Sequence, residues 1–129
     1  MSYTYNNRAV HRTWLLLKIT YALAPILVGA DKLIGWWLGN WAQYVSPIIT
    51  SYFPITLAQV VVVVGVIEII AGILVWLHPR WGGYVVAAWL LAIIINLASM
   101  NKFYDIIARD TLIAVGAIAL AWLTAARES

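Results

Sequence analysis

The chain has 129 residues, of which 64% are hydrophobic and only 10% are charged, and its mean hydropathy is +0.90. A water-soluble domain of ordinary composition carries about 25% charged residues, so this sequence has too few charged side chains to cover a soluble surface. The composition therefore indicates a membrane protein, and the length indicates a single transmembrane domain over residues 1–129.

The charge pattern and the missing cysteines exclude several kinds of chemistry. The formal charge is +3, and the Lys and Arg residues are scattered singly, unlike the basic patch of a nucleic-acid-binding protein. Without cysteine the chain itself cannot form a disulfide, a Cys-ligated zinc site or an iron–sulfur cluster. His11 and His78 flank apolar stretches, so neither lies at the mid-depth that a bis-histidine haem requires. We expect no metal and no cofactor within the chain, apart from a bound quinone or lipid.

Four apolar stretches predict transmembrane helices. Each reaches the roughly 20 residues that a helix needs to cross about 30 Å of hydrocarbon. Backbone polar groups must be satisfied internally in lipid, which favours a helix even for the valine run that starts at Val60. Pro25 predicts a kink in the first helix. The stretches are about residues 14–36, 57–77, 81–100 and 106–126.

The links between these stretches predict an antiparallel four-transmembrane-helix bundle. The second and third stretches are joined only by "HPRW", and the third and fourth only by "NKFYD". Links this short force neighbouring helices to run antiparallel. The first link, about residues 37–56, is longer, uncharged and rich in aromatic residues, with prolines at Pro47 and Pro54. We expect it to form a short helix in the membrane interface, followed by a turn.

The placement of Lys and Arg predicts that both termini are cytoplasmic. In that orientation most cations lie on the cytoplasmic side, and each cation on the other side has a carboxylate within a few residues of it. We expect the inner membrane of a bacterial or archaeal cell. Aromatic residues mark both expected interfaces: Trp14, Trp76, Trp81 and Trp122 at one, and Trp36, Trp37, Trp41, Tyr44, Tyr52, Phe53 and Tyr104 at the other.

Ten polar residues converge on the outer side of the predicted bundle. Glu68 lies deepest, because eleven positions after Leu57 at 1.5 Å per residue place it about 16 Å along its helix, near the midplane. A charge there costs about 2.5–3.5 kcal/mol on insertion scales, so it should face a partner inside the bundle. The set comprises Asp31, Lys32, Glu68, Asn96, Asn101, Lys102, Tyr104, Asp105, Arg109 and Asp110.

Small residues predict where the helices touch. Gly65 and Gly72 share a helix face with Glu68, which lets a neighbouring helix approach closely around the carboxylate. A second stripe on one face of the fourth helix consists of Asp110, Ala114, Ala117 and Ala121.

Two interpretations of the polar set stay open. Its members either only hold the helices together, or line a pocket toward the outer leaflet that binds a polar head group or accepts protons. In the second case the outer tryptophans Trp36, Trp37 and Trp41 could wall a flat aromatic ligand. The first interpretation predicts pairs of Arg109 with Asp31 and Asp110, of Lys32 or Lys102 with Asp105, and of Glu68 with Asn96.

The motifs around these residues resemble the DoxX-like family of small four-helix integral membrane proteins. The resemblance covers about residues 14–125 and rests on "VGADKL", on the E-x-x-x-G of Glu68 and Gly72, and on "YDIIARD". It implies a four-helix bundle and, more loosely, a connection to sulfur-compound oxidation and the quinone pool. The positions that it carries over are Asp31, Glu68, Arg109 and Asp110.

The resemblance and the deep carboxylate favour a quinone-linked or redox-associated membrane subunit. Quinone reduction takes two electrons and two protons, so Glu68 is a candidate proton acceptor, and a partner would have to supply the electrons. Whether the chain is an enzyme stays open. The alternative is a non-catalytic accessory or assembly subunit, and a proton or small-solute transporter is less favoured because no inverted repeat is visible. Expected partners are the lipid bilayer, other membrane or redox subunits or further copies of the chain, and no nucleic acid.

Overall fold

A computed structural model describes residues 7–34 and 40–128 of the chain. In this part of the chain every regular element is a helix, and four of the helices are long and apolar enough to cross a membrane, which fits an integral membrane protein. The elements are α1 (Asn7–Ile34), the 3-10 helix η1 (Trp41–Tyr44), α2 (Pro47–Tyr52), α3 (Leu57–Leu77), α4 (Pro79–Ser99) and α5 (Tyr104–Glu128).

The long helices follow the four predicted stretches closely. The predicted stretch 57–77 has the same bounds as α3, and α4 and α5 begin two residues before the predicted starts. Helix α1 begins seven residues earlier than predicted, and the predicted end at Trp36 lies outside the described residues, as does Trp37. Helix α1 includes Pro25, and a kink there stays a prediction.

Local signals explain where the helices begin and turn. Thr56 caps α3 in a reciprocal capping box with Gln59, so two of the first free N–H groups have side-chain partners. Helix α4 starts at Pro79, whose fixed φ and missing N–H suit the first helical position. The turn from α4 to α5 needs positive φ at two non-glycine residues, Asn101 (55°) and Phe103 (65°).

The link between α1 and α3 contains two short helices where the sequence predicted one. Ser46 separates them: it caps α2 by accepting from the N–H of Ile48, and its own backbone N–H donates to Asn96 Oδ1 at 3.0 Å. Asn96 Nδ2 also donates to the carbonyl of Tyr44 at 2.6 Å, and Ser99 Oγ donates to Ser46 Oγ at 2.8 Å. Side chains of α4 therefore hold the backbone of the link in place.

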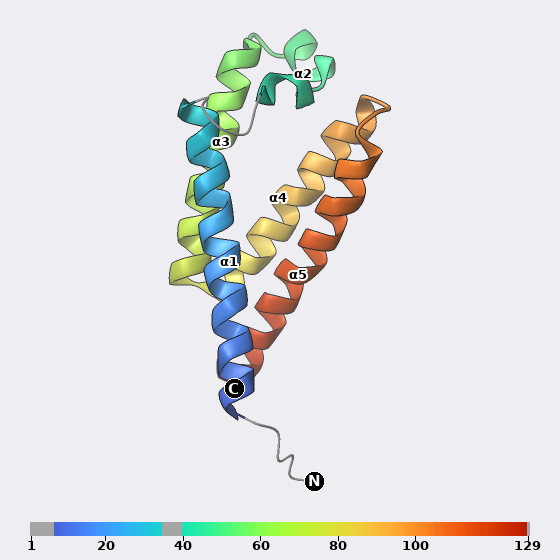
Figure 1. Cartoon of the computed structure of the whole chain (residues 1–129). Coiled ribbons are helices and arrows are strands. Elements are labelled where there is room, and N and C mark those ends of the chain that lie inside the picture. Colours follow the sequence, from blue (N-terminus) through green and yellow to red (C-terminus); the bar gives the residue numbers. More distant parts are fainter. Residues whose placement is uncertain (1–6, 35–39, 129) are drawn as a thin grey trace.

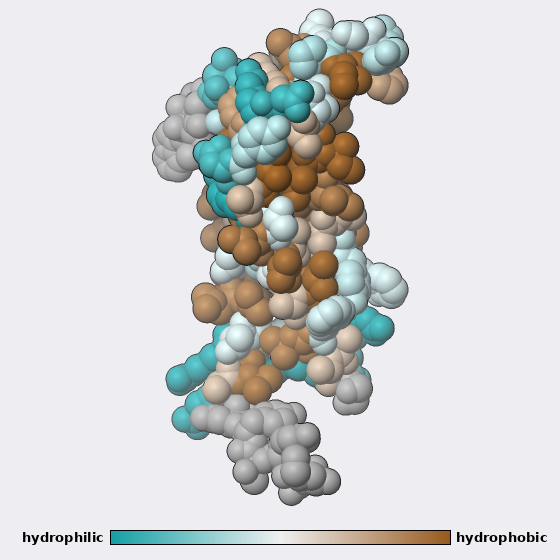
Figure 2. All heavy atoms as spheres, turned by 90° about the vertical axis from the view of Figure 1, so that its right-hand side faces the viewer, coloured by the Kyte–Doolittle hydropathy of each residue, from teal (hydrophilic) through white to brown (hydrophobic). Residues whose placement is uncertain are grey.

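The four long helices pack chiefly as two pairs (Figure 1). Helix α1 lies along α3, and α4 lies along α5. The pairs meet at the end where α1 begins and α5 ends, here called the terminal end, and they separate toward the opposite end, here called the α2 end. Figure 2 shows hydrophobic residues over the middle of one face and hydrophilic residues above and below them. The buried core consists of Ala22, Ala71, Val75, Val86, Ala117 and Leu120.

Small residues create the close contacts within both pairs, which confirms the predicted contact faces. A Cβ on Gly29 of α1 would lie 2.5 Å from the carbonyl oxygen of Gly65 in α3, so only glycine permits this approach. In the other pair, a Cβ on Gly83 of α4 would lie 2.6 Å from the carbonyl oxygen of Ala117 and 3.0 Å from the Cβ of Ala121.

Candidate functional site

A buried ion pair joins α1 to α3. The Lys32 ammonium group donates to Glu68 Oε1, and the two side chains are only 9% and 10% exposed. The pair forms because the glycine face of α3 brings α1 close: a Cβ on Gly65 would lie 3.1 Å from Lys32 Cβ. The deepest charge of the chain thus has the partner that its expected depth in the membrane requires.

Trp41 of η1 covers this pair. Its ring lies over the Lys32 ammonium group, 4.1 Å from nitrogen to ring centroid, and its indole Nε1 donates to Asp31 Oδ2 at 2.7 Å. Asp31 and Glu68 are each 7% exposed. Because Asp31 and Lys32 are adjacent in α1, one tryptophan contacts both the carboxylate and the cation. We call Asp31, Lys32, Trp41 and Glu68 the Lys32–Glu68 cluster.

Helix α5 adds another carboxylate close to the cluster. Asp110 is 5% exposed, accepts from Arg109 Nε at 3.4 Å, and interacts electrostatically with both Lys32 and Glu68. The Arg109 side chain itself is 65% exposed. The predicted contact of Arg109 with Asp110 is confirmed. Three buried carboxylates thus lie on or near a single buried ammonium group, and their excess of negative charge makes them candidate proton acceptors.

The remaining predicted site residues lie outside the cluster. The predicted bond between Glu68 and Asn96 is wrong, because Glu68 pairs with Lys32 and Asn96 bonds to the backbone of the link. The predicted pairing of Asp105 with Lys32 or Lys102 is wrong for Lys32, which pairs with Glu68. Among the described residues Lys102 forms no ion pair with Asp105 either, and Asp105 is exposed. The other three belong to the α4–α5 turn: Tyr104 Oη contacts Asn101 Oδ1 at 3.4 Å, and Lys102 lies over the ring of Phe103 at 5.0 Å.

The sequence did not reveal that Trp41 belongs to the polar cluster. The sequence alone indicates an interface marker or one wall of a ligand site, together with Trp36 and Trp37, which lie outside the described residues. The signal available in the sequence was an aromatic residue ten positions after Asp31 in an uncharged link, with Asn40 before it. In the structure Asn40 caps η1 by accepting from the N–H of Ala42, and this cap fixes the start of the short helix at Trp41.

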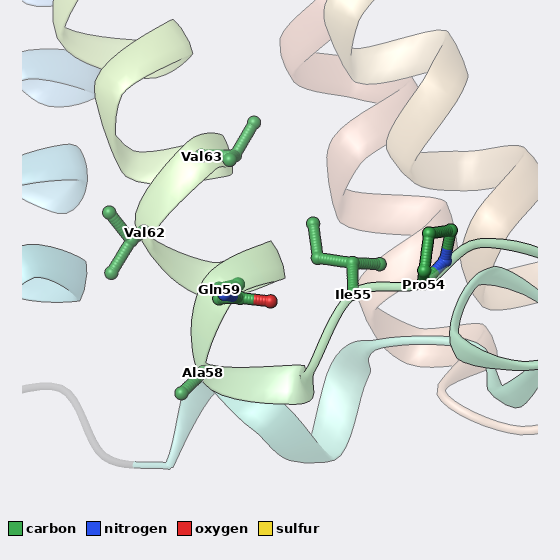
Figure 3. A pocket seen from close by; sticks show the side chains of 6 residues that line it. All are labelled: Pro54, Ile55, Ala58, Gln59, Val62 and Val63. Atoms are coloured by element: carbon green, nitrogen blue, oxygen red, sulfur yellow. The ribbon is translucent and has the colours of Figure 1, made fainter.

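A shallow hollow lies on a different face of α3 (Figure 3). Its volume is about 510 Å³, and Figure 3 shows Ile55 and Val63 on facing sides of it. Gln59 in its lining and Glu68 are nine residues apart on α3, or about 2.5 turns, so their side chains leave opposite sides of the helix. The hollow is therefore no extension of the cluster. Its lining consists of Pro54, Ile55, Ala58, Gln59, Val62 and Val63.

The Lys32–Glu68 cluster offers a hydrogen-bond donor and a carboxyl group side by side. A lysine ammonium has three N–H donors, of which Glu68 takes one, so Lys32 can also donate to a carbonyl oxygen. A carboxyl group beside that donor can hold or release a proton. Metal binding has no comparable support, since no three His, Asp or Glu side chains gather as ligands within residues 7–34 and 40–128.

A scan against protein-family models and searches of curated proteins and of solved structures found no match to this chain. The resemblance to the DoxX-like family therefore stays a prediction that rests on the motifs named above.

Proposed function

We propose that this chain is a DoxX-like integral membrane protein that serves as a quinone-linked subunit of a redox complex. The observation that carries the proposal is the buried Lys32–Glu68 ion pair beneath Trp41, with Glu68 near the middle of α3, a helix that we expect to cross the membrane. A buried pair of this kind is costly, and intramembrane ionisable residues commonly mark functional sites.

The residues of the cluster have distinct roles in this proposal. A bound quinone supplies the chemistry of accepting two electrons and two protons. Lys32 orients the head group by donating a hydrogen bond to one of its carbonyl oxygens, and the Glu68 carboxylate takes up a proton and passes it to that oxygen. Trp41 excludes water from one side of the pair and fixes Lys32 through its ring. A partner subunit with a flavin, haem or metal supplies the electrons.

The proposal includes an arrangement in the membrane. The four long helices form an antiparallel bundle, the link with η1 and α2 lies in the outer interface, and both termini are cytoplasmic, in a bacterial or archaeal inner membrane. Two observations support it. The link is uncharged and its Trp41 reaches back to the end of α1, and most Lys and Arg residues lie at the terminal end.

Native mass spectrometry of the protein, extracted gently from its own membrane, tests the proposed function. Wild type should carry a quinone, and Glu68→Gln and Lys32→Gln should both lose it while remaining monodisperse in size-exclusion chromatography. A co-purifying subunit with a redox cofactor would identify the electron source. If wild type carries only bulk lipid and both variants merely unfold more easily, the quinone-linked function is contradicted.

An accessory subunit without chemistry of its own is the second candidate. The observation that favours it is that each buried charge has a partner within the chain: Lys32 with Glu68, Asp31 with Trp41, and Asp110 with Arg109. In that case the charges hold α1, α3, η1 and α5 together and contact no ligand. Replacing the pair with Lys32→Met and Glu68→Leu would then leave assembly with partner subunits unchanged, because apolar residues can replace a buried ion pair without loss of stability.

A further inference from the structure

The two ends of the molecule differ in how their charges are balanced. Five of the eight Lys and Arg residues, but only one of the five Asp and Glu residues, lie at the terminal end. At the α2 end the deeply buried cation is paired with a carboxylate, whereas the terminal end holds a surplus of positive charge. The charged residues of the terminal end are Arg8, Arg12, Lys18, Arg80, Arg127 and Glu128.

Two of these cations share one aromatic ring. The Lys18 ammonium nitrogen lies 5.0 Å from the ring centroid of Trp14, and the Arg127 guanidinium carbon lies 4.3 Å from the same centroid. The two charges are thus at most about 9.3 Å apart, the sum of these distances, which is close to one Debye length at physiological salt. Trp14 itself is fixed, because its Nε1 donates at 2.9 Å to the buried Thr124 of α5.

Neither cation has a carboxylate at ion-pair distance among the described residues. Lys18 has aromatic neighbours instead, Trp14 and the Trp76 ring at 4.5 Å. Arg127 contacts His11 Nδ1 at 3.1 Å, and an imidazole ring supplies no negative charge. The carboxylate of Glu128 pairs with Arg80 at 3.6 Å. Two like charges on one ring repel each other, so an anion between them would lower the energy of this arrangement.

The position of Lys18 and Arg127 along the helices indicates which kind of anion they would bind. Trp76, which contacts Lys18, is the penultimate residue of α3, and Arg127 is the penultimate residue of α5. Both cations therefore lie where the long apolar helices end, at the level expected for lipid head groups. Exposed tryptophans at the same end, among them Trp81 and Trp122, are typical of an interface of this kind.

We propose that Lys18 and Arg127, both held against the ring of Trp14, form a binding site for the phosphate of one anionic phospholipid. The two cations come from α1 and α5, so a bound head group also fastens the first and last helices together. His11, at hydrogen-bond distance from Arg127, completes the polar side of the site.

Native mass spectrometry of the full chain in mixed micelles tests this proposal. The micelles contain equal amounts of phosphatidylglycerol and phosphatidylcholine with the same acyl chains. Wild type should carry mainly phosphatidylglycerol, and Lys18→Gln with Arg127→Gln should lower that preference by about tenfold, since each cation near an anionic lipid contributes to binding. Equal binding of the two lipids by wild type would overturn the proposal.

Matched variants separate a built site from diffuse attraction. Arg12→Gln with Arg80→Gln removes the same charge from the same end without touching Trp14, and the lipid preference should stay within about twofold of wild type. Lys18→Arg with Arg127→Lys keeps both charges and should keep the preference. An equal loss in the Arg12/Arg80 variant, or a loss in the charge-conserving one, contradicts the proposal. Displacement of the lipid by millimolar inorganic phosphate would assign the site to a soluble anion and overturn it as well.

Discussion

Lys32 and Glu68 depend on each other, because each would be an unpaired buried charge without its partner. Glu68→Gln leaves the Lys32 ammonium with a neutral amide, and we expect the free energy of unfolding in detergent to fall by about 3 kcal/mol. Lys32→Met with Glu68→Leu removes both charges and should restore stability to within about 1 kcal/mol of wild type. Equilibrium unfolding of the three proteins measures both effects. Equal stability of wild type and Glu68→Gln would show that the pair is not buried in the membrane.

Trp41 has two contacts that substitution can separate. Trp41→Phe keeps an aromatic ring over Lys32 but removes the indole donor to Asp31, so we expect a loss of about 1.5 kcal/mol from this one charge-assisted hydrogen bond. Trp41→Ala removes the ring as well and should cost more. Thermal unfolding in one detergent ranks the two variants. A reversed order would mean that the ring does not cover Lys32.

At the scale of the helices, the contact between α1 and α3 depends on glycine. A Cβ on Gly29 would meet backbone at 2.5 Å, so Gly29→Ala must push the helices apart, and we expect a cost of about 2 kcal/mol. Gly116→Ala is the comparison, because the added Cβ there meets the end of the Tyr21 side chain, which can rotate away. The second substitution should cost only about 1 kcal/mol, from the lost bond between Tyr21 Oη and the Ile113 carbonyl.

Unfolding curves for both glycine variants decide this prediction. If Gly29→Ala is as stable as wild type, the two helices do not pack as closely as the structure describes. The Lys32–Glu68 pair would then also be open to rearrangement, since Gly29 and Gly65 set the distance between its two helices.

The helices were largely predictable from the sequence, whereas the side-chain partners were not. Helix α3 has its predicted bounds because length, hydropathy and the cap at Thr56 all act locally. The pairing of Glu68 with Lys32 depends on which helix packs against the glycine face of α3. This is set by tertiary packing, which the local sequence pattern does not determine. The partners of Asn96 could not be predicted from the sequence for a similar reason. Its side chain bonds to backbone groups of the link between α1 and α3, which lack helical partners there. The sequence does not show that this link passes beside α4.

At the scale of the whole molecule, the paired helices and the unequal charge of the two ends predict one orientation in the membrane. The native chain has no cysteine, so single cysteines can report on it directly. We introduce Thr13→Cys at the terminal end or Gln43→Cys in η1, both at exposed positions. A membrane-impermeant maleimide should label Gln43→Cys in intact cells. It should label Thr13→Cys only after the cells have been permeabilised. Labelling of both positions from outside would contradict cytoplasmic termini.

The most direct test of the central claim is equilibrium binding of a short-tailed quinone to the purified protein. The measurement compares wild type with the Lys32→Met and Glu68→Leu double variant, which should fold as stably but has lost both the donor and the carboxyl group. We predict saturable binding by wild type and a loss of at least about tenfold in the double variant. Equal affinity of the two folded proteins would contradict the claim that the Lys32–Glu68 cluster binds the head group.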